Sequence, residues 1–328
     1  MQIVVADIGG THARFALAEI GDGKVVGLAC ETVLKVAGHA SLHAAWQAFA
    51  AVTGRPLPRA AAIAVACPVG GPGASDVLHL TNNPWVIRPA LIAGQIGVDT
   101  ITVLNDFAAV GHAVAHAGDD AFVPLCGPDR PLAKSGIVGI VGPGTGLGVA
   151  MLVRDGDGDR VIATEGGHAD FAPLDSIEDG VLARLRARFG RVSVERIVAG
   201  PGLVELYEAL AAIEGRAVPP VAAADLWARA LAGDDGPAAA ALDHFCRCLG
   251  AVAGDIALTQ GAFAGMVIAG GVGLRLAGYL PRSGFRQRFV AKGRFEALMA
   301  QVPVRILTHP QPGLFGAAAA FVGEHRPG

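Results

Sequence analysis

The chain has 328 residues, 52% of them hydrophobic, which is enough for two domains with a sizeable core. Its net charge of −3 argues against a nucleic-acid-binding surface, which would need clustered Lys and Arg. No apolar stretch reaches the roughly 18 residues of a membrane span, and the start Met1-Gln2-Ile3 lacks the basic region of a signal peptide. The five cysteines have no disulfide-framework spacing, so we expect buried free thiols and a cytoplasmic protein.

The hydrophobic pattern predicts the same strand order twice. In the first part we expect strands over 3–8, 14–20, 24–30, 61–66 and 101–104, and helices over 41–52, 89–96 and 106–117. In the second part we expect strands over 136–141, 149–153, 160–164, 266–269 and 302–307, and helices over 177–189, 202–213, 222–232, 237–261 and 313–322. Each part opens with a strand triplet, which indicates a duplicated α/β fold with mixed sheets.

The domain boundary is predicted from composition. Residues 115–135 are rich in Gly, Asp and Pro, and the last helix could return to the first domain. We therefore expect a small α/β domain of residues 1–115 plus 310–328, and a large α/β domain of residues 116–309.

Two glycine-threonine turns follow the first strand of each part. They are Asp7-Ile8-Gly9-Gly10-Thr11 and Gly142-Pro143-Gly144-Thr145-Gly146-Leu147-Gly148. Glycine allows a close approach to a ligand, and successive backbone N–H groups form an anion site. An ordinary hairpin turn would explain one such turn. Two matching turns, one led by an acidic residue, favour binding of a nucleotide phosphate chain.

Asn105-Asp106 ends one predicted strand and starts a helix. Ligands bind at the carboxyl ends of strands in α/β sheets. Asp106 could accept a proton from a substrate hydroxyl, or it could simply be a helix N-cap, and its position alone leaves both roles open.

Further candidate residues lie in the second part of the chain. Glu165 and His168 fit a polar clamp on a hydroxylated substrate better than a metal site, since no third ligand is obvious. Glu195 could be part of a helix surface. Gly270-Gly271 suits either close approach by an adenosine or tight packing. No P-loop, Rossmann fingerprint, nucleophile elbow or H-E-x-x-H motif occurs.

Taken together, the motifs resemble bacterial glucokinase, of the hexokinase and actin-like ATPase superfamily. Besides the two turns, the resemblance covers Leu104-Asn105-Asp106-Phe107, Glu165-Gly166-Gly167-His168, Ser193-Val194-Glu195-Arg196, Gly200-Pro201-Gly202-Leu203, Leu80-Thr81-Asn82-Asn83-Pro84-Trp85, Ile268-Ala269-Gly270-Gly271, Lys292-Gly293-Arg294-Phe295 and Pro312-Gly313-Leu314-Phe315-Gly316. It implies a two-domain actin-like ATPase (ribonuclease H-like) fold with an interdomain cleft, and ATP-dependent phosphorylation of glucose at its 6-hydroxyl.

The resemblance also implies a role for each site residue. Asp106 would be the general base. The sugar would be bound by Asn105, Glu165, His168 and Glu195. ATP would be bound by Asp7, Gly9, Gly10, Thr11, Gly144, Thr145, Gly270 and Gly271. Asp7 would also hold Mg²⁺ through water, and the family suggests a homodimer.

This chain departs from the family pattern at a few positions. His12 stands where asparagine is common, Pro143 where alanine is common, and Asn83-Pro84 replaces a histidine-threonine pair. Two alternatives stay open: a kinase for another hexose or an amino sugar, and a non-catalytic sugar sensor of the same fold.

Overall fold

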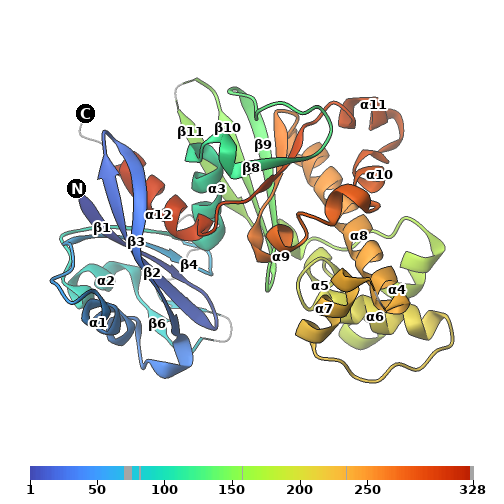
Figure 1. Cartoon of the computed structure of the whole chain (residues 1–328), viewed down its shortest axis with the longest axis horizontal. Coiled ribbons are helices and arrows are strands. Elements are labelled where there is room, and N and C mark those ends of the chain that lie inside the picture. The colour runs from blue at the N-terminus through green and yellow to red at the C-terminus, as the bar shows by residue number, and fades with distance from the viewer. Residues whose placement is uncertain (70–75, 81–82, 157, 234, 326–328) are drawn as a thin grey trace. The chain divides into compact units, whose positions relative to one another are not determined.

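The computed structural model describes residues 1–69, 76–80, 83–156, 158–233 and 235–325. The chain divides into two compact units: unit 1 is Met1–Ala117 with His309–Gly328, and unit 2 is Gly118–Thr308. Each unit has its own sheet and its own helices, which are labelled in Figure 1. Within the described ranges, no helix has both the length and the apolar character needed to cross a membrane.

Unit 1 is built on a five-stranded sheet of order β3-β2-β1-β4-β7. Its strands are β1 (Gln2–Ile8), β2 (His12–Gly21), β3 (Lys24–Lys35), β4 (Ala60–Val65) and β7 (Thr100–Asn105). The first three strands are antiparallel, whereas β4 and β7 run parallel to β1. A separate small ladder joins β5 (Leu78–His79) to β6 (Val86–Ile87).

Helices cover both faces of the unit 1 sheet. They are α1 (Leu42–Thr53), α2 (Pro89–Ile96), α3 (Asp106–His116) and α12 (Pro312–Glu324), with a 3₁₀ turn at Val36–Gly38. Alternate residues of β1 point to opposite faces: Val4 packs in one core cluster with Trp46 of α1, and Ile3 in the other with Leu314 of α12. A strand buried on both faces reads as a continuous apolar run, which is why the sequence predicted β1 and β4.

Unit 2 repeats this arrangement in a six-stranded sheet of order β11-β10-β9-β12-β13-β8. Its strands are β8 (Phe122–Cys126), β9 (Gly136–Pro143), β10 (Leu147–Arg154), β11 (Asp159–Thr164), β12 (Gly265–Ile268) and β13 (Val304–Leu307). Strands β9 to β11 are antiparallel, and β12 and β13 run parallel to β9. Without the edge strand β8, the order and directions match those of unit 1, so the sheet is duplicated as predicted.

Helix α8 of unit 2 is 25 residues long. It spans Gly236–Gln260. The other helices of this unit are α4 (Ser176–Phe189), α5 (Val194–Ile197), α6 (Gly202–Ile213), α7 (Ala223–Ala232), α9 (Gly270–Arg275), α10 (Phe285–Val290) and α11 (Glu296–Met299). Short 3₁₀ turns lie at Asp119–Ala121, Gly166–His168, Leu280–Arg282 and Gly293–Phe295. α6, α7 and α10 pack against α8, and most of the buried residues of α8 belong to one core cluster of this unit.

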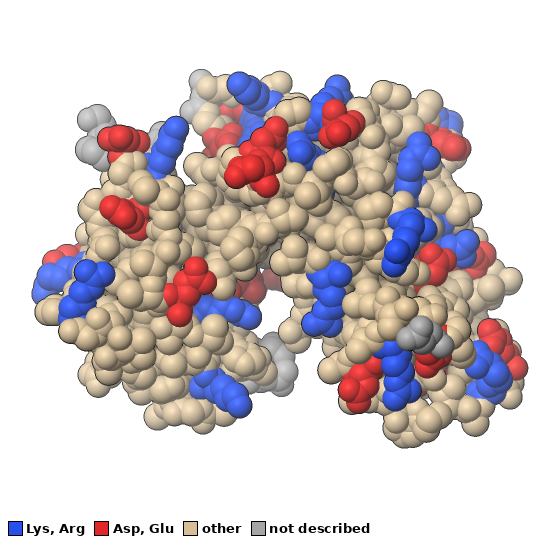
Figure 2. All heavy atoms as spheres, viewed as in Figure 1, with Lys and Arg blue, Asp and Glu red and all other residues tan. Residues whose placement is uncertain are grey.

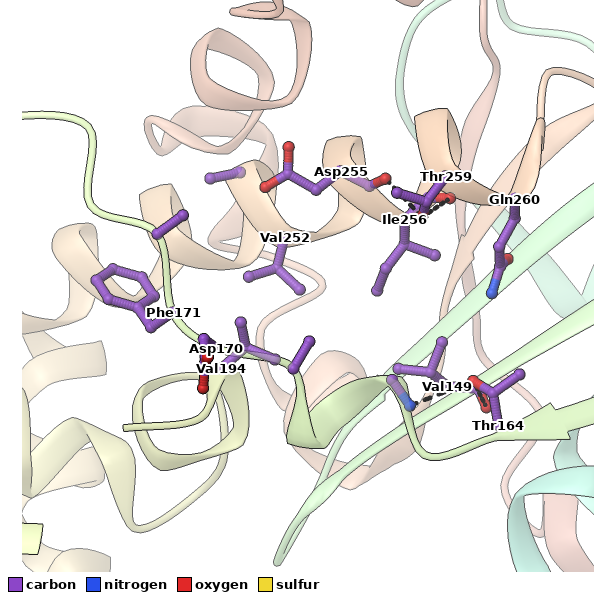
Figure 3. A pocket seen from close by; sticks show the side chains of 14 residues that line it. Val149, Thr164, Asp170, Phe171, Val194, Val252, Asp255, Ile256, Thr259 and Gln260 are labelled. Carbon is purple, nitrogen blue, oxygen red and sulfur yellow. Dashed lines mark hydrogen bonds between the residues drawn. The ribbon is translucent and has the colours of Figure 1, made fainter. Parts of the chain in front are cut away.

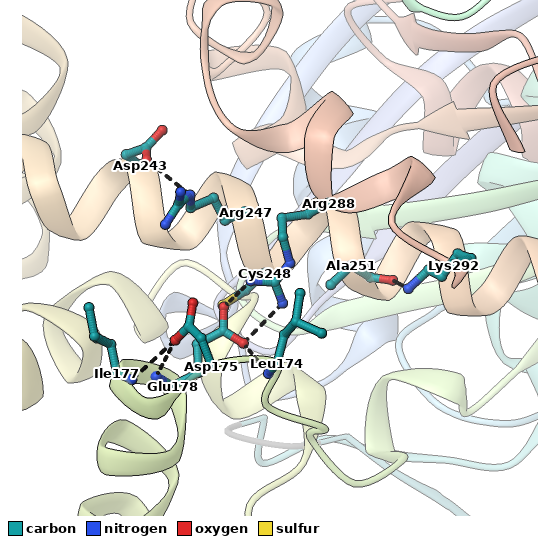
Figure 4. Close-up of polar contacts among 10 residues, drawn as sticks. All are labelled: Leu174, Asp175, Ile177, Glu178, Asp243, Arg247, Cys248, Ala251, Arg288 and Lys292. Carbon is teal, nitrogen blue, oxygen red and sulfur yellow. Dashed lines mark hydrogen bonds and ion pairs between the residues drawn. The ribbon is translucent and has the colours of Figure 1, made fainter. Parts of the chain in front are cut away.

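A buried ion pair joins α4 to α10 (Figure 4). The side chains of Glu178 and Arg288 are only 2% and 7% exposed. Arg288 donates to both carboxylate oxygens of Glu178, at 2.5 and 3.0 Å, and the backbone N–H of Leu174 donates to Oε2 at 2.8 Å. The pair therefore fixes the start of α4 and the residue before its cap, Asp175.

The cysteines differ in exposure. All five are free thiols, and Cys246 and Cys248 are buried as predicted. Burial raises the pKa of the Cys246 thiol to about 12, so this thiol is un-ionised at neutral pH. The prediction of burial is wrong for Cys30, which is exposed on β3.

The surface charges are mixed in sign. On the face drawn in Figure 2, Lys and Arg side chains alternate with Asp and Glu, and no large area of one sign is visible. This pattern agrees with the net charge of −3 and differs from the basic stripe of a nucleic-acid-binding protein.

Candidate active site

The first glycine-threonine turn connects β1 to β2. The N–H of Gly9 donates to the carbonyl of His12 at 3.0 Å, which closes the turn. In the described part of the chain, the N–H groups of Gly10 and Thr11 donate to no acceptor. The Thr11 hydroxyl lies 3.0 Å from Nδ1 of His12. The turn therefore offers two adjacent backbone donors, the arrangement that binds an anion.

Asp7 lies on β1 just before this turn. It pairs in register with Arg14 of β2, whose Nη1 is 3.5 Å from Asp7 Oδ2. Burial raises the pKa of the Asp7 carboxyl, and Arg14 partly offsets this rise. A nearby cation would favour the charged form of such a carboxylate, which suits Mg²⁺. Among the described residues, no cluster of three or more His, Cys, Asp and Glu could hold a metal ion.

Asn105 and Asp106 lie at the end of β7 and the start of α3. Oδ1 of Asn105 accepts hydrogen bonds from the N–H groups of Phe107 and Ala108, at 2.9 and 3.0 Å. The N-cap of α3 is therefore Asn105 and not Asp106, for which the sequence had left this role open. Asp106 is the first residue of the helix, where the positive end of the helix dipole stabilises a carboxylate.

The functional candidates of unit 1 meet at one edge of its sheet. Ile8 of β1 is in register with Val65 of β4, which in turn is in register with Asn105 of β7. The three parallel strands thus end together, with the Gly9–Thr11 turn following one strand and Asp106 another. This carboxyl edge is where ligands bind in α/β sheets.

The second turn has the equivalent place in unit 2, between β9 and β10. The N–H of Gly144 donates to the carbonyl of Gly146 at 2.8 Å, and the Gly144 carbonyl accepts from the N–H of Gly200 at 2.7 Å. Within the described ranges, the N–H groups of Thr145 and Gly146 donate to no acceptor. In both turns, therefore, the N–H of the first glycine closes the turn, and the next two N–H groups are available to a ligand.

Gly270 and Gly271 begin α9 beside this second turn. Gly270 has φ of 76°, and a Cβ there would lie 2.6 Å from the carbonyl oxygen of Pro143. Tight packing, one of the two roles that the sequence left open for this position, therefore requires glycine at residue 270. At Gly271, by contrast, nothing lies within 4 Å of an added Cβ.

Glu165, His168 and Glu195 lie on two neighbouring segments of unit 2. Glu165 follows β11, and its Oε2 is 3.9 Å from Nε2 of His168, with both side chains well exposed. Glu195 is on α5, and its Oε2 accepts a hydrogen bond from the N–H of Leu147 at 2.8 Å. The two segments are joined by the N–H of Val194, which donates to the carbonyl of Ala169 at 2.8 Å.

A pocket of about 300 Å³ lies behind these two segments, between β10 and α8 (Figure 3). Its mostly apolar lining includes Gly166, Ala169 and Val194, which flank the predicted sugar-binding residues, and Val252 and Ile256 of α8. Sequence reasoning missed it because its walls come from segments far apart in the chain. None of the residues predicted to bind the sugar or ATP lines this pocket.

Sequence reasoning also missed two contacts at the first glycine-threonine turn. Arg14 lies beside Asp7, and the side chain of Asn83 donates to the carbonyl of Gly9 at 3.0 Å. Asn83 belongs to the Leu80–Trp85 motif, of which Thr81 and Asn82 lie outside the described residues.

Comparison with known proteins identifies the family. The glucokinase family model matches residues 4–324. The glucokinase of Zymomonas mobilis subsp. mobilis is 58% identical over 325 residues, covering 99% of each chain. The crystal structure of a glucokinase from an Antarctic psychrotroph is 34% identical, with a TM-score of 0.83, and covers 98% of this chain and 99% of that one.

A more distant likeness supports the fold alone. The ROK family glucokinase from Streptomyces griseus, solved with glucose and AMPPNP, is 20% identical, with a TM-score of 0.65, and covers 98% of this chain and 99% of that one. The duplicated mixed sheets are those of the actin-like ATPase fold that these kinases share. On the family model and on its full-length relatives, the chain belongs to the glucokinase family.

Proposed function

We propose that this protein is an ATP-dependent glucokinase, which converts glucose and ATP to glucose 6-phosphate and ADP. The observation that carries the proposal is the pair of equivalent turns, Gly9–Thr11 and Gly144–Gly146, each with two available N–H groups at the same place of a duplicated sheet. Membership of the glucokinase family supports the same reaction.

The chemical step needs a base at the sugar and donors at the phosphates. Asp106 takes the proton of the glucose 6-hydroxyl as the oxygen forms its bond to the γ-phosphorus. The bond from that phosphorus to the β-phosphate bridging oxygen breaks, and ADP leaves. The two turns hold the phosphate oxygens through their N–H groups, so catalysis is mostly positioning and stabilisation of charge. Gly270 and Gly271 lie beside the adenosine.

The other sugar hydroxyls are bound by Asn105, Glu165, His168 and Glu195. A site that pairs each hydroxyl with a polar side chain rejects an analogue that lacks one, because a polar group is then left unpaired. Glu165 and His168 are adjacent and exposed, which supports their availability to a ligand. The N-cap bonds of Asn105 hold its amide rigidly at the end of β7.

Magnesium, location and assembly complete the proposal. Asp7 would hold Mg²⁺ through water, and the ion would neutralise charge on the phosphates. The partly buried Asp7 carboxyl, which lies just before the first turn, supports this role. We also propose that the enzyme works in the cytoplasm as a homodimer.

The deciding experiment is a phosphorylation assay with Mg-ATP and a panel of sugars: glucose, mannose, fructose, glucosamine and N-acetylmannosamine. We expect ADP release that depends on glucose, with glucose 6-phosphate as the product. Faster turnover of another sugar would instead identify a kinase for that hexose or amino sugar. Glucose binding with no ADP release for any sugar would identify a sugar sensor.

A further inference from the structure

Asn83 connects a buried aromatic anchor to the first phosphate turn. Its Nδ2 donates to the carbonyl of Gly9 at 3.0 Å, and its Oδ1 accepts from the backbone N–H of Trp85 at 2.9 Å. One contact needs an amide donor and the other an acceptor, so the orientation of the Asn83 amide is fixed by its partners. The contact to Gly9 spans 74 positions of the sequence.

The anchor itself is held firmly. Trp85 is 2% exposed and belongs to the core cluster that also contains Trp46 and Phe49. Its indole N–H donates to the carbonyl of His39 at 2.8 Å. Asn83 is therefore attached at one end to a rigid part of unit 1, and at the other end to the turn.

The bond to Gly9 sets the direction of a donor in the turn. The peptide between Gly9 and Gly10 is planar and trans, so its C=O and its N–H point in opposite directions. Holding the Gly9 carbonyl toward Asn83 therefore turns the Gly10 N–H away from Asn83. That N–H is one of the two in the turn with no acceptor among the described residues.

We propose that Asn83 is a positioning residue that orients the Gly10 N–H toward a nucleotide phosphate. The inference rests on the proposed function, because that function brings a phosphate to this turn. Without the contact, the peptide between Gly9 and Gly10 can rotate, and part of the binding energy is spent on fixing it. One backbone hydrogen bond of ordinary strength corresponds to an affinity change of about 3- to 10-fold.

The test compares Asn83→Asp, Asn83→Ala and the control Gln47→Glu. Asn83→Asp keeps the acceptor for Trp85, removes the donor to Gly9 and adds a negative charge. Asn83→Ala removes both contacts without adding a charge, so it separates loss of the donor from repulsion of phosphate. Gln47 is an exposed residue of α1, and its change to Glu repeats the amide-to-acid exchange away from the turn.

The measurements are the Kd of ATP by titration calorimetry, the Kd of glucose by tryptophan fluorescence, and the melting temperature. We expect both Asn83 variants to bind ATP about 3- to 10-fold more weakly. Glucose affinity should stay within about two-fold of wild type, and Gln47→Glu should change neither value. Unchanged ATP affinity in Asn83→Ala would overturn the proposal, as would an equal loss for ATP and glucose together with a lowered melting temperature. A wild-type protein that binds ATP without phosphorylating any sugar would refute the proposed function and leave this test valid.

Discussion

The Glu195 carboxylate is hydrogen-bonded to the first residue after the second turn. Its Oε2 accepts from the N–H of Leu147 at 2.8 Å, and a Cβ on Gly146 would overlap the same carboxylate. Glu195 is also one of the residues proposed to bind glucose. A single side chain that is proposed to bind the sugar thus also contacts the turn proposed to bind phosphate.

This dual position predicts different effects for two substitutions at Glu195. Glu195→Gln keeps an oxygen that can accept from Leu147, so it should raise mainly the KM for glucose. Glu195→Ala removes both contacts and should raise the KM for glucose and for ATP, each by about 10-fold or more, as expected for lost hydrogen bonds to a charged group. Steady-state kinetics with each substrate varied measures both values. Equal effects of the two variants on the KM for ATP would show that the contact to Leu147 is unimportant for the turn.

The second prediction separates the base from the helix cap. Asp106→Asn should lower kcat by about 10²- to 10⁴-fold, the usual contribution of a general base, and leave the Kd of glucose nearly unchanged. Asn105→Ala removes the N-cap and should cost about 1 kcal/mol of stability. Turnover measured beside urea denaturation distinguishes the two. An Asp106→Asn enzyme with near wild-type kcat would exclude Asp106 as the base.

Much of the fold could be predicted because its strands are short apolar runs that end in turn residues. The first strand of each triplet and the parallel strands that follow the triplets are of this kind, whereas β3 is 12 residues long and mostly exposed, and its second half was not predicted. β8 was missed because residues 122–126 lie in a stretch rich in Gly, Asp and Pro, and only pairing with β13 makes them a strand. α9, α10 and α11 have six, six and four residues, too few for a helical period to stand out.

The sequence indicated a candidate site only where its residues are consecutive. The two turns and the Asn105-Asp106 pair carry their signal locally, in glycines and in a polar pair after an apolar run. The contacts of Asn83 with Gly9, and of Glu195 with Leu147, join residues 74 and 48 positions apart. No periodicity or spacing reports such contacts, because they depend on how strands and loops are brought together.

The buried ion pair of unit 2 provides the third prediction. Arg288→Met leaves the Glu178 carboxylate buried without its charged partner, and should lower the free energy of unfolding by about 3–5 kcal/mol. Changing Glu178→Leu in addition removes the unpaired charge and should recover much of that loss. Arg59 pairs with Asp99 on the surface, where both side chains are more than half exposed, so Arg59→Met is the control with a small effect. Urea denaturation measures the free energy of unfolding of each variant. A double variant no more stable than Arg288→Met would show that the unpaired Glu178 carboxylate does not cause the loss of stability.

His309 provides a prediction about pH. Burial lowers the pKa of its imidazole, partly offset by Glu31, and Nδ1 accepts a hydrogen bond from the N–H of Gln311 at 3.1 Å. Because the folded-state pKa lies below the unfolded value of about 6.5, the unfolded chain binds more protons as the pH falls through that region. The stabilising contribution of neutral His309 is therefore complete above about pH 6.5 and is lost at lower pH.

The corresponding variant is His309→Asn, whose side-chain oxygen can still accept from Gln311 but does not titrate. Between about pH 7.5 and pH 5.5, its free energy of unfolding should fall less than that of wild type. Chemical denaturation at several pH values gives the two slopes. Identical slopes would mean that other groups account for the acid sensitivity.

The last prediction concerns the β-bulge between β2 and β3. Phe15 pairs with Thr32 and Leu17 with Ala29, so Cys30 and Glu31 together oppose Ala16. Cys30 has φ of 56°, the left-handed conformation that glycine usually provides at the first position of such a bulge. A left-handed residue with a Cβ costs about 1–2 kcal/mol, and the greater freedom of glycine in the unfolded chain offsets part of the gain from removing it.

Cys30→Gly should therefore raise the free energy of unfolding by about 0.5–1 kcal/mol. Cys30→Ala is the matched control, because it also removes the exposed thiol but keeps the Cβ. The hydrogen bond from the Thr32 hydroxyl to the carbonyl of residue 30, 3.0 Å long, is available in both variants. Urea denaturation under reducing conditions should rank Cys30→Gly above wild type and Cys30→Ala close to it. A gain of equal size in Cys30→Ala would attribute the effect to loss of the thiol and not to the backbone conformation.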